Sequence, residues 1–201
     1  MEWWEALLLI GGGTVAGVIN AVAGGGSTLT VPLLVLAGVP GNSANGSNRV
    51  GILTSNAAAA TAFRRLGVRG LSQSARVLVP IVVGSLIGAF AITRLTDDTF
   101  ERVFGLLMLP IIFLSIRKPK VRVDADPWPL WFTVAVFFAI GLYGGAVQAG
   151  VGLVLLGALT RAGYDLVTAN NVKVVANLTL TSVVLPIFIV QGKVEWIPAL
   201  I

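Results

Sequence analysis

Two cationic side chains, Arg49 and Lys173, are embedded in stretches that carry no other charge. Arg49 is followed by Val-Gly-Ile-Leu-Thr-Ser, and Lys173 stands in the run Val-Lys-Val-Val-Ala-Asn. A charge at the centre of a membrane helix costs about 2.5–3.5 kcal/mol on insertion scales, so an embedded cation indicates a function. The chemistry that these two residues offer is the binding of an anion. The alternative is that each side chain extends to the nearer membrane interface.

Each cation follows a glycine-rich interruption of an apolar segment. The first interruption contains Gly24-Gly25-Gly26-Ser-Thr, and the second reads Gln148-Ala-Gly-Val-Gly152. Glycine weakens a helix interior by about 1 kcal/mol relative to alanine. A helix that restarts after such a break presents free N–H groups and the positive end of its dipole, which favour an anion. The alternative is close packing of helices through small residues.

The two interruptions and the two cations follow one common spacing. A shift of 124 residues superimposes Gly17 on Gly141, Gly26 on Gly150 and Arg49 on Lys173. Interrupted helices at corresponding positions of two halves are the best sequence indication of a transporter binding site. The spacing therefore predicts two tandem repeats that together form one pocket for a small divalent or bulky oxyanion.

Uncharged hydrogen-bonding residues accompany the cations. Lys173, Asn177 and Thr181 are four residues apart and share one face of a helix. Such a face serves equally well for hydrogen bonds between helices. The candidate substrate-binding residues are Gly24, Gly25, Gly26, Ser27, Thr28, Asn48, Arg49, Gly150, Gly152, Asn171, Lys173 and Asn177.

The composition is that of a membrane protein. Of the 201 residues, 56% are hydrophobic and 11% are charged, whereas soluble domains carry about 25% charged residues. Histidine and cysteine are absent, and no predicted span has an acidic residue in its middle. We therefore expect no enzyme activity, no metal site, no cofactor and no proton relay of the usual kind. The net charge of +5 comes from residues between apolar runs, so no nucleic-acid partner is expected.

The fold class that these patterns predict is an all-α, polytopic transmembrane helical bundle in which the first helix of each repeat is broken by glycines. The breaks are expected near residues 23–27 and 148–152. The predicted segments are the half-helices Leu7–Val22 and Thr28–Ala37, the spans Asn45–Phe63, Val77–Ile92 and Phe104–Ile116, a broken segment Pro129–Leu159, the span Ala169–Val190 and a further segment beginning at Trp196.

These segments divide the chain into repeat one (residues 1–117), a connector (118–127) and repeat two (128–201). Repeat two has fewer segments, so we expect a C-terminal truncation or a partner that supplies the rest, and a homo-oligomer stays open. The basic connectors 64–76 and 117–122 are predicted to be cytoplasmic. If each broken segment crosses the membrane once, the repeats share one orientation. If the segments are re-entrant hairpins, the N-terminus lies outside.

Several stretches resemble the TauE/SafE family of sulfite exporter-like permeases. They are Ala16–Leu34, Gly38–Pro40 and Ala44–Val50 in the first half, and Gly150–Gly152 and Ala169–Asn177 in the second. The resemblance covers nearly the whole chain and implies a multi-pass permease of the bacterial inner membrane for small sulfur-containing anions such as sulfite, sulfonates or sulfoacetate. The final spans of the family pattern are absent or shortened here, and the Asn-Gly-Ser-Asn-Arg stretch varies in the family, so substrate identity does not carry over.

The predicted function is transport of a small anion across the lipid bilayer by alternating access, with a sulfur oxyanion or an organosulfonate as the substrate. One alternative is a passive anion channel, which would show a conductance too high for alternating access. Another is a membrane scaffold that transports nothing, for which Arg49→Ala and Lys173→Ala would leave the phenotype unchanged.

Overall fold

The computed structural model is helical throughout the residues that it describes, which are 3–22, 24–68, 75–116 and 128–201. The predicted connectors 117–122 and 118–127, and residues 69–74 of the first basic connector, lie outside these ranges. The helices are α1 (Trp3–Val22), α2 (Ser27–Leu36), α3 (Gly41–Arg65), α4 (Ala75–Ile92), α5 (Asp97–Ile116), α6 (Leu130–Ala146), α7 (Val151–Arg161), α8 (Leu166–Val190) and α9 (Trp196–Leu200).

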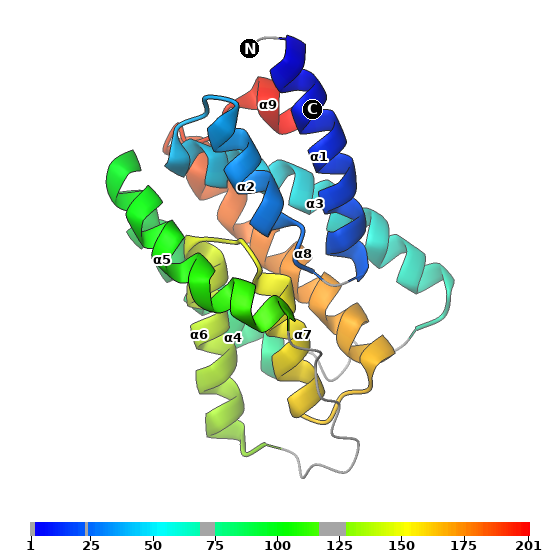
Figure 1. Cartoon of the computed structure of the whole chain (residues 1–201). Coiled ribbons are helices and arrows are strands. Elements are labelled where there is room, and N and C mark those ends of the chain that lie inside the picture. Colours follow the sequence, from blue (N-terminus) through cyan, green and yellow to red (C-terminus); the bar gives the residue numbers. More distant parts are fainter. Residues whose placement is uncertain (1–2, 23, 69–74, 117–127) are drawn as a thin grey trace.

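The two interrupted segments are hairpins. In the first, α1 packs on α2 with the chain reversed, because a Cβ on Gly12 would meet Leu33 and one on Gly26 would lie 2.8 Å from the Cβ of Asn20. In the second, α6 packs on α7, and a Cβ on Gly144 would lie 2.7 Å from Val151. Figure 1 shows the α1–α2 hairpin at one end of the molecule and the α6–α7 hairpin toward the other, with both turns near the middle. Both interrupted segments therefore reverse the direction of the chain at their turns.

Two long helices, α3 and α8, pack against each other between the hairpins. Each has 25 residues, a length of about 37 Å at 1.5 Å per residue, which exceeds the roughly 30 Å of a bilayer's hydrocarbon core. Within the described residues, α8 is the helix whose length and apolar composition together suffice for a membrane crossing. The four helices α2, α4, α6 and α7 are apolar but shorter.

Helix α4 makes the most extensive helix contact of the described chain with α6, and it also packs against α8. Small residues permit this approach. A Cβ on Gly141 would lie 2.7 Å from the Cα of Ile81, and one on Gly145 would lie 2.6 Å from the Cα of Ser85. Apolar side chains of α4, α6, α7 and α8 form the largest buried cluster around this contact. Close backbone approach through glycine is the usual means by which helices associate in lipid, where hydrophobic burial gives no driving force.

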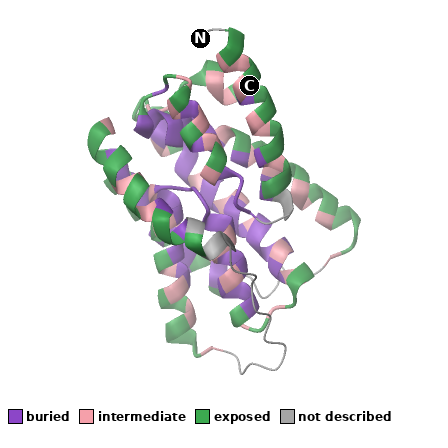
Figure 2. Cartoon of the chain, in the orientation of Figure 1, coloured by how far each residue is buried: buried purple, intermediate pink, exposed green. Residues whose placement is uncertain are grey.

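The interior of the bundle is buried and its outer helix faces are exposed (Figure 2). Besides apolar side chains, the interior holds many polar ones, and many large apolar side chains are exposed, which is unusual for a soluble protein. Buried polar groups include Arg49, Lys173 and Gln148. Ionisable groups inside a membrane protein face the interior of the bundle, whereas an apolar exterior suits lipid. The exposed apolar residues cover most helices and include Leu7, Val18, Val79, Leu106, Trp131 and Val190.

Several helices begin earlier than the sequence predicts, and α3 and α5 show the reason. Helix α3 begins at Gly41 rather than near Asn45, because Asn42 is bonded inside the protein: its side-chain amide donates to Ile92 O at 2.9 Å and its main-chain N–H to an Asp97 carboxylate oxygen at 3.0 Å. Helix α5 begins at Asp97 rather than near Phe104, with two acidic residues in its first turn, where the helix dipole favours them. The hydropathy pattern failed at both starts because polar side chains occupy them.

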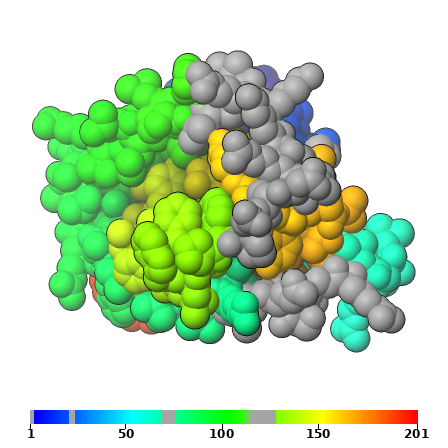
Figure 3. All heavy atoms as spheres, turned by 90° about the horizontal axis from the view of Figure 1, so that it is seen from below, coloured from blue at the N-terminus to red at the C-terminus, as the bar shows by residue number. Residues whose placement is uncertain are grey.

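The C-terminal end of α3 and the N-terminal ends of α6 and α8 lie toward one face of the molecule (Figures 1 and 3). The N-terminal end of α1 and helix α9 lie at the opposite end (Figure 1). Arg64, Arg65 and Arg161 close α3 and α7 at the first of these faces, where they complement the negative ends of the helix dipoles.

Helix α8 has a side-chain cap at its start. A carboxylate oxygen of Asp165 accepts hydrogen bonds from the main-chain N–H groups of Val167 and Thr168, both at 3.0 Å. Hydrogen bonds from Thr168 hold the pKa of this exposed carboxyl group below its ordinary value. Asp165 therefore stabilises α8 when it is ionised.

Replacing Asp165 should reveal this cap through pH. Asp165→Ala is expected to lower the free energy of unfolding by about 1 kcal/mol at neutral pH. Because the folded-state pKa is lowered, the ionic part of this stabilisation is fully present above the ordinary value of about 3.9 and disappears as the pH falls through the folded-state value.

The measurement is thermal unfolding of detergent-solubilised protein between pH 7 and pH 3. Asp165→Asn is the matched control, since asparagine also caps a helix but does not titrate. It should lose less stability on acidification than the parent protein does. Equal losses in the two proteins would show that the ionised cap contributes nothing.

Candidate functional site

The turns of the two hairpins touch each other through glycine. A Cβ on Gly24 would lie 2.8 Å from the carbonyl carbon of Gly152, and a Cβ on Gly152 would lie 2.6 Å from the Cα of Gly24. Gly24 has a φ of 81°, and Gly150 a φ of 72°, in the left-handed region that glycine adopts without strain. The candidates Gly24, Gly150 and Gly152 are therefore brought together, and the contact leaves no room for a side chain at Gly24 or Gly152.

Ser27 joins one turn to the other. Its hydroxyl group donates to Gln148 O at 3.3 Å and accepts from the main-chain N–H of Gly150, also at 3.3 Å. Thr28 acts locally, since its hydroxyl group donates to Gly25 O at 2.6 Å. A Cβ on Gly25 would lie 3.0 Å from the Leu153 side chain. Of the predicted residues at the start of α2, Ser27 thus bonds across the interface, whereas the Thr28 methyl group only packs there, 3.3 Å from the Cβ position of Gly150.

Arg49 is fully buried, with an exposed fraction of 0%. Its guanidinium group donates to Gly144 O at 3.2 Å and Gly145 O at 2.6 Å, and to the side-chain oxygen of Gln148 at 2.6 Å. These carbonyl groups belong to the last turn of α6, at the negative end of the helix dipole. The guanidinium carbon also lies 4.5 Å from the centroid of the Phe188 ring, which adds a cation–π contact.

Gln148 extends this contact into a network. Its amide group donates to Asn177 Oδ1 at 3.0 Å and to the Thr181 hydroxyl oxygen at 3.3 Å, while its oxygen accepts from Arg49. Gln148 has a φ of 63°, an uncommon value for a residue with a side chain. The network links α3, the second turn and α8, and it places the predicted Asn177 beside the second break.

Lys173 is buried to 1% exposure, and its ammonium nitrogen lies 3.5 Å from Asn20 O in the last turn of α1. A shift of 124 residues superimposes Arg49 on Lys173 and Gly144 on Asn20. The cation of each half therefore binds a last-turn carbonyl group of the broken helix in the other half. No salt bridge to either cation occurs in the described part of the chain, where Lys193 and Asp97 form an ion pair at 3.9 Å.

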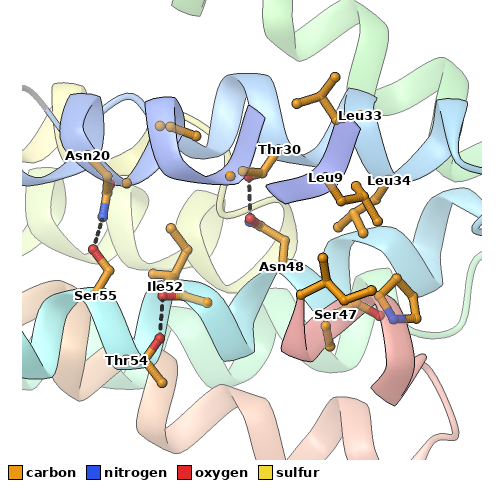
Figure 4. Close-up of a pocket in the computed structure, with 18 of the residues that line it drawn as sticks. Leu9, Asn20, Thr30, Leu33, Leu34, Ser47, Asn48, Ile52, Thr54 and Ser55 are labelled. Atoms are coloured by element: carbon orange, nitrogen blue, oxygen red, sulfur yellow. Dashed lines mark hydrogen bonds between the residues drawn. The ribbon is translucent and has the colours of Figure 1, made fainter. Parts of the chain in front are cut away.

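A cavity of about 490 Å³ lies between α1, α2 and α3, with α9 at one end. Figure 4 shows Asn48 bonded to the Thr30 hydroxyl group and Asn20 directed at Ser55, 3.4 Å away. The side-chain oxygen of Asn20 and the side-chain nitrogen of Asn48 are buried without a partner among the described atoms. Of the predicted site residues, Gly26 and Asn48 line this cavity.

The remaining candidate, Asn171, lies away from the two turns. Its side-chain amide donates to Val68 O at 3.3 Å, next to the end of α3. This bond ties α8 to the end of α3, so the structure does not bring Asn171 together with the cations. No cluster of His, Cys, Asp and Glu side chains that could hold a metal ion occurs among the described residues.

Sequence reasoning missed Asn20 and Gln148 as members of this site. Both residues stand inside the motifs that carry the repeat, and both are polar residues within apolar segments. A polar residue within an apolar segment was the signal that could have identified both residues. The glycines and the cations were assigned to the site because their spacing repeats along the chain. Asn20 and Gln148 do not repeat, since Asn20 corresponds to a glycine and Gln148 corresponds to Gly24.

The contact between the turns can be tested with Gly152→Ala. The added methyl group would overlap the Gly24 backbone, so we expect a loss of about 1–3 kcal/mol in the free energy of unfolding. Gly11→Ala is the control: a Cβ there would meet nothing within 4 Å, so the change should be neutral or stabilise α1 by up to about 1 kcal/mol. Thermal unfolding in detergent measures both. Equal stability of the two variants would contradict the close contact.

Comparison with known proteins places this arrangement in a family. Residues 9–201 match the family described as "Sulfite exporter TauE/SafE". The chain is 27% identical to a "Probable membrane transporter protein ORF9" of Sinorhizobium sp, with 90% of this chain and 71% of that protein aligned. It is 28% identical to a "Probable membrane transporter protein" of Haemophilus influenzae, with 92% and 74% aligned. No solved structure matches the chain. The chain belongs to the sulfite exporter TauE/SafE family.

Proposed function

We propose that this chain is a membrane transporter that moves a small anion, with a sulfur oxyanion or a small organosulfonate as the substrate class. The observation that carries the proposal is the burial of Arg49 and Lys173 beside the two helix breaks with no carboxylate partner in the described residues. The neutral carbonyl groups that bind these cations offset their charge only in part, so an electropositive centre lies inside the bundle. An anion that reaches this centre is stabilised there.

The electrostatic argument depends on where the charges lie. A charge in the interior of a membrane protein interacts through a low effective dielectric, so an opposite charge is attracted far more strongly there than in water. Buried ionisable groups of membrane proteins usually pair with one another or mark the path of an ion or substrate. Two cations without an acidic partner favour an anionic solute over a cation or a proton.

Alternating access is supported by the arrangement of the halves. The α1–α2 hairpin and the α6–α7 hairpin approach the middle from opposite ends (Figure 1), and their breaks superimpose with a shift of 124 residues. We interpret the halves as repeats of inverted orientation. In transporters of this kind, discontinuous helices meet at the bilayer midplane, and one repeat moves against the other around the site.

The direction of insertion follows from charge. Arg64, Arg65 and Arg161 lie at the ends of α3 and α7, and cytoplasmic loops are enriched in such residues. We place this face in the cytoplasm and the N-terminus outside, in the inner membrane of a bacterium. The sulfur-containing substrate class is supported by membership of the sulfite exporter TauE/SafE family, and the partners of the chain are then the anion and the lipid bilayer.

Flux into proteoliposomes tests the proposal. The parent protein should take up radiolabelled sulfite or methanesulfonate saturably and should show counterflow, which a passive channel does not. Arg49→Ala/Lys173→Ala should lower the initial rate by about tenfold or more, because both buried charges are lost.

Lys193→Ala is the matched control, since Lys193 pairs with Asp97 away from the site. It should keep the parent rate. Both variants must elute as folded protein by size-exclusion chromatography. A folded parent protein that moves neither anion would refute the substrate assignment, and flux without counterflow would favour a channel.

A further inference from the structure

The two cations occupy corresponding positions but are held differently. Arg49 donates three hydrogen bonds, two of them at 2.6 Å, and packs on the Phe188 ring. The ammonium group of Lys173 reaches one acceptor among the described residues, Asn20 O, at 3.5 Å, the outer limit for a hydrogen bond. The buried Nε of Arg49 has no partner among the described atoms, so each cation keeps unused N–H donors. The difference is that three hydrogen bonds and a ring contact fix the position of the Arg49 guanidinium group, whereas one long contact holds the Lys173 ammonium group.

Gln148 contributes to this difference, since it accepts one of the three hydrogen bonds of Arg49. Its side chain supplies an acceptor to Arg49 and is itself held by Asn177 and Thr181. Shifted by 124 residues, Gln148 corresponds to Gly24, which has no side chain to offer Lys173. Asn177 and Thr181 correspond to Leu53 and Ala57, which cannot hydrogen-bond through their side chains. Polar side chains of the protein therefore lie beside the second break, whereas the corresponding positions at the first break have no polar side chain.

Two buried polar atoms without partners lie at the cavity beside the first break. The Asn20 side-chain oxygen and the Asn48 side-chain nitrogen are buried without partners among the described atoms, and both residues line the cavity between α1, α2 and α3. The oxygen and nitrogen of an asparagine amide are assigned rather than observed, so Asn20 can present either an acceptor or a donor. Since Asn20 also carries the carbonyl group that binds Lys173, the cavity extends to the residue that Lys173 contacts.

We infer that the cations have separate roles: Lys173, with Asn20, binds the transported anion, and Arg49 is a positioning residue that holds the second break in shape. An oxygen of the anion replaces or joins the Asn20 carbonyl group at the Lys173 ammonium group, and the Asn20 side-chain amide turns to donate to it. The inference rests on the proposed function and adds to it which half of the site recognises charge.

The test separates affinity from turnover in four variants. Probes are sodium sulfite and sodium methanesulfonate, with binding followed by the anion-dependent shift in melting temperature and transport by the KM and maximal rate of flux. Lys173→Met keeps the length of the side chain and removes its charge. It should weaken binding and raise KM by about tenfold or more while the anion-free protein keeps its melting temperature, and Lys173→Arg should restore binding to within about threefold.

The matching changes at the second break are Arg49→Lys and Gln148→Gly. Arg49→Lys keeps the charge but cannot reproduce the planar set of hydrogen bonds. Gln148→Gly places at the second break the residue that the first break has at Gly24. Glycine adopts a positive φ without strain, so this variant should fold even if Arg49→Lys does not. Both should lower the melting temperature and the maximal rate while changing KM by less than about threefold.

The outcomes are distinct. Tenfold weaker binding in Gln148→Gly or Arg49→Lys, together with parent-like affinity in Lys173→Met, would reverse the two roles and overturn the inference. An equal loss of affinity in Lys173→Met, Arg49→Lys and Gln148→Gly would also overturn the inference, because the two cations would then act as one site. Such results would leave the anion transport itself intact, whereas a parent protein that neither binds nor moves either probe would refute the proposed function and the inference together.

Discussion

The structure depends on one reciprocal interaction, in which the cation of each half binds the last-turn carbonyl groups of the broken helix in the other half. A helix that ends inside a membrane protein leaves carbonyl groups without partners, and a buried cation needs acceptors. Arg49 of α3, which donates to the end of α6, and Lys173 of α8, which contacts the end of α1, meet both needs at once. The exchange explains how a hairpin turn persists at the centre of the bundle and why both cations are buried without a carboxylate partner in the described chain.

The rest of the packing follows from a lipid-facing exterior. Because lipid is as apolar as the exposed side chains, burial of those side chains cannot hold the helices together, and close approach and polar bonds must do so. Glycines bring α4 against α6 and one turn against the other. Buried asparagines then tie helix ends to neighbouring helices, as Asn42 does with the end of α4 and Asn45 with Ala146 at the end of α6.

Positions that correspond by the shift of 124 residues differ in their surroundings. Gly17 of α1 lines the open cavity and has no atom within 4 Å of its Cβ position, whereas its counterpart Gly141 packs on Ile81 of α4. Val172, the counterpart of Asn48, lies in the apolar core. Polar groups without partners are therefore concentrated in the first half. Asymmetry of this kind suits a binding site better than a purely structural repeat, because buried unsatisfied groups cost about 1–3 kcal/mol each unless a partner meets them.

The sequence by itself determined the helical class, the positions of both breaks and the spacing that pairs Arg49 with Lys173, because these depend on local hydropathy, glycine and repetition along the chain. It did not determine the starts of α3 and α5, because polar residues at these starts have the composition expected of a connector. The choice between a straight crossing and a hairpin, the hydrogen bonds of each cation to the opposite half, and the roles of Asn20 and Gln148 were decided only by tertiary structure. The reason is that these features depend on which carbonyl groups of a segment distant in sequence lie near each cation in space. Hydropathy along the chain does not report distances between such segments.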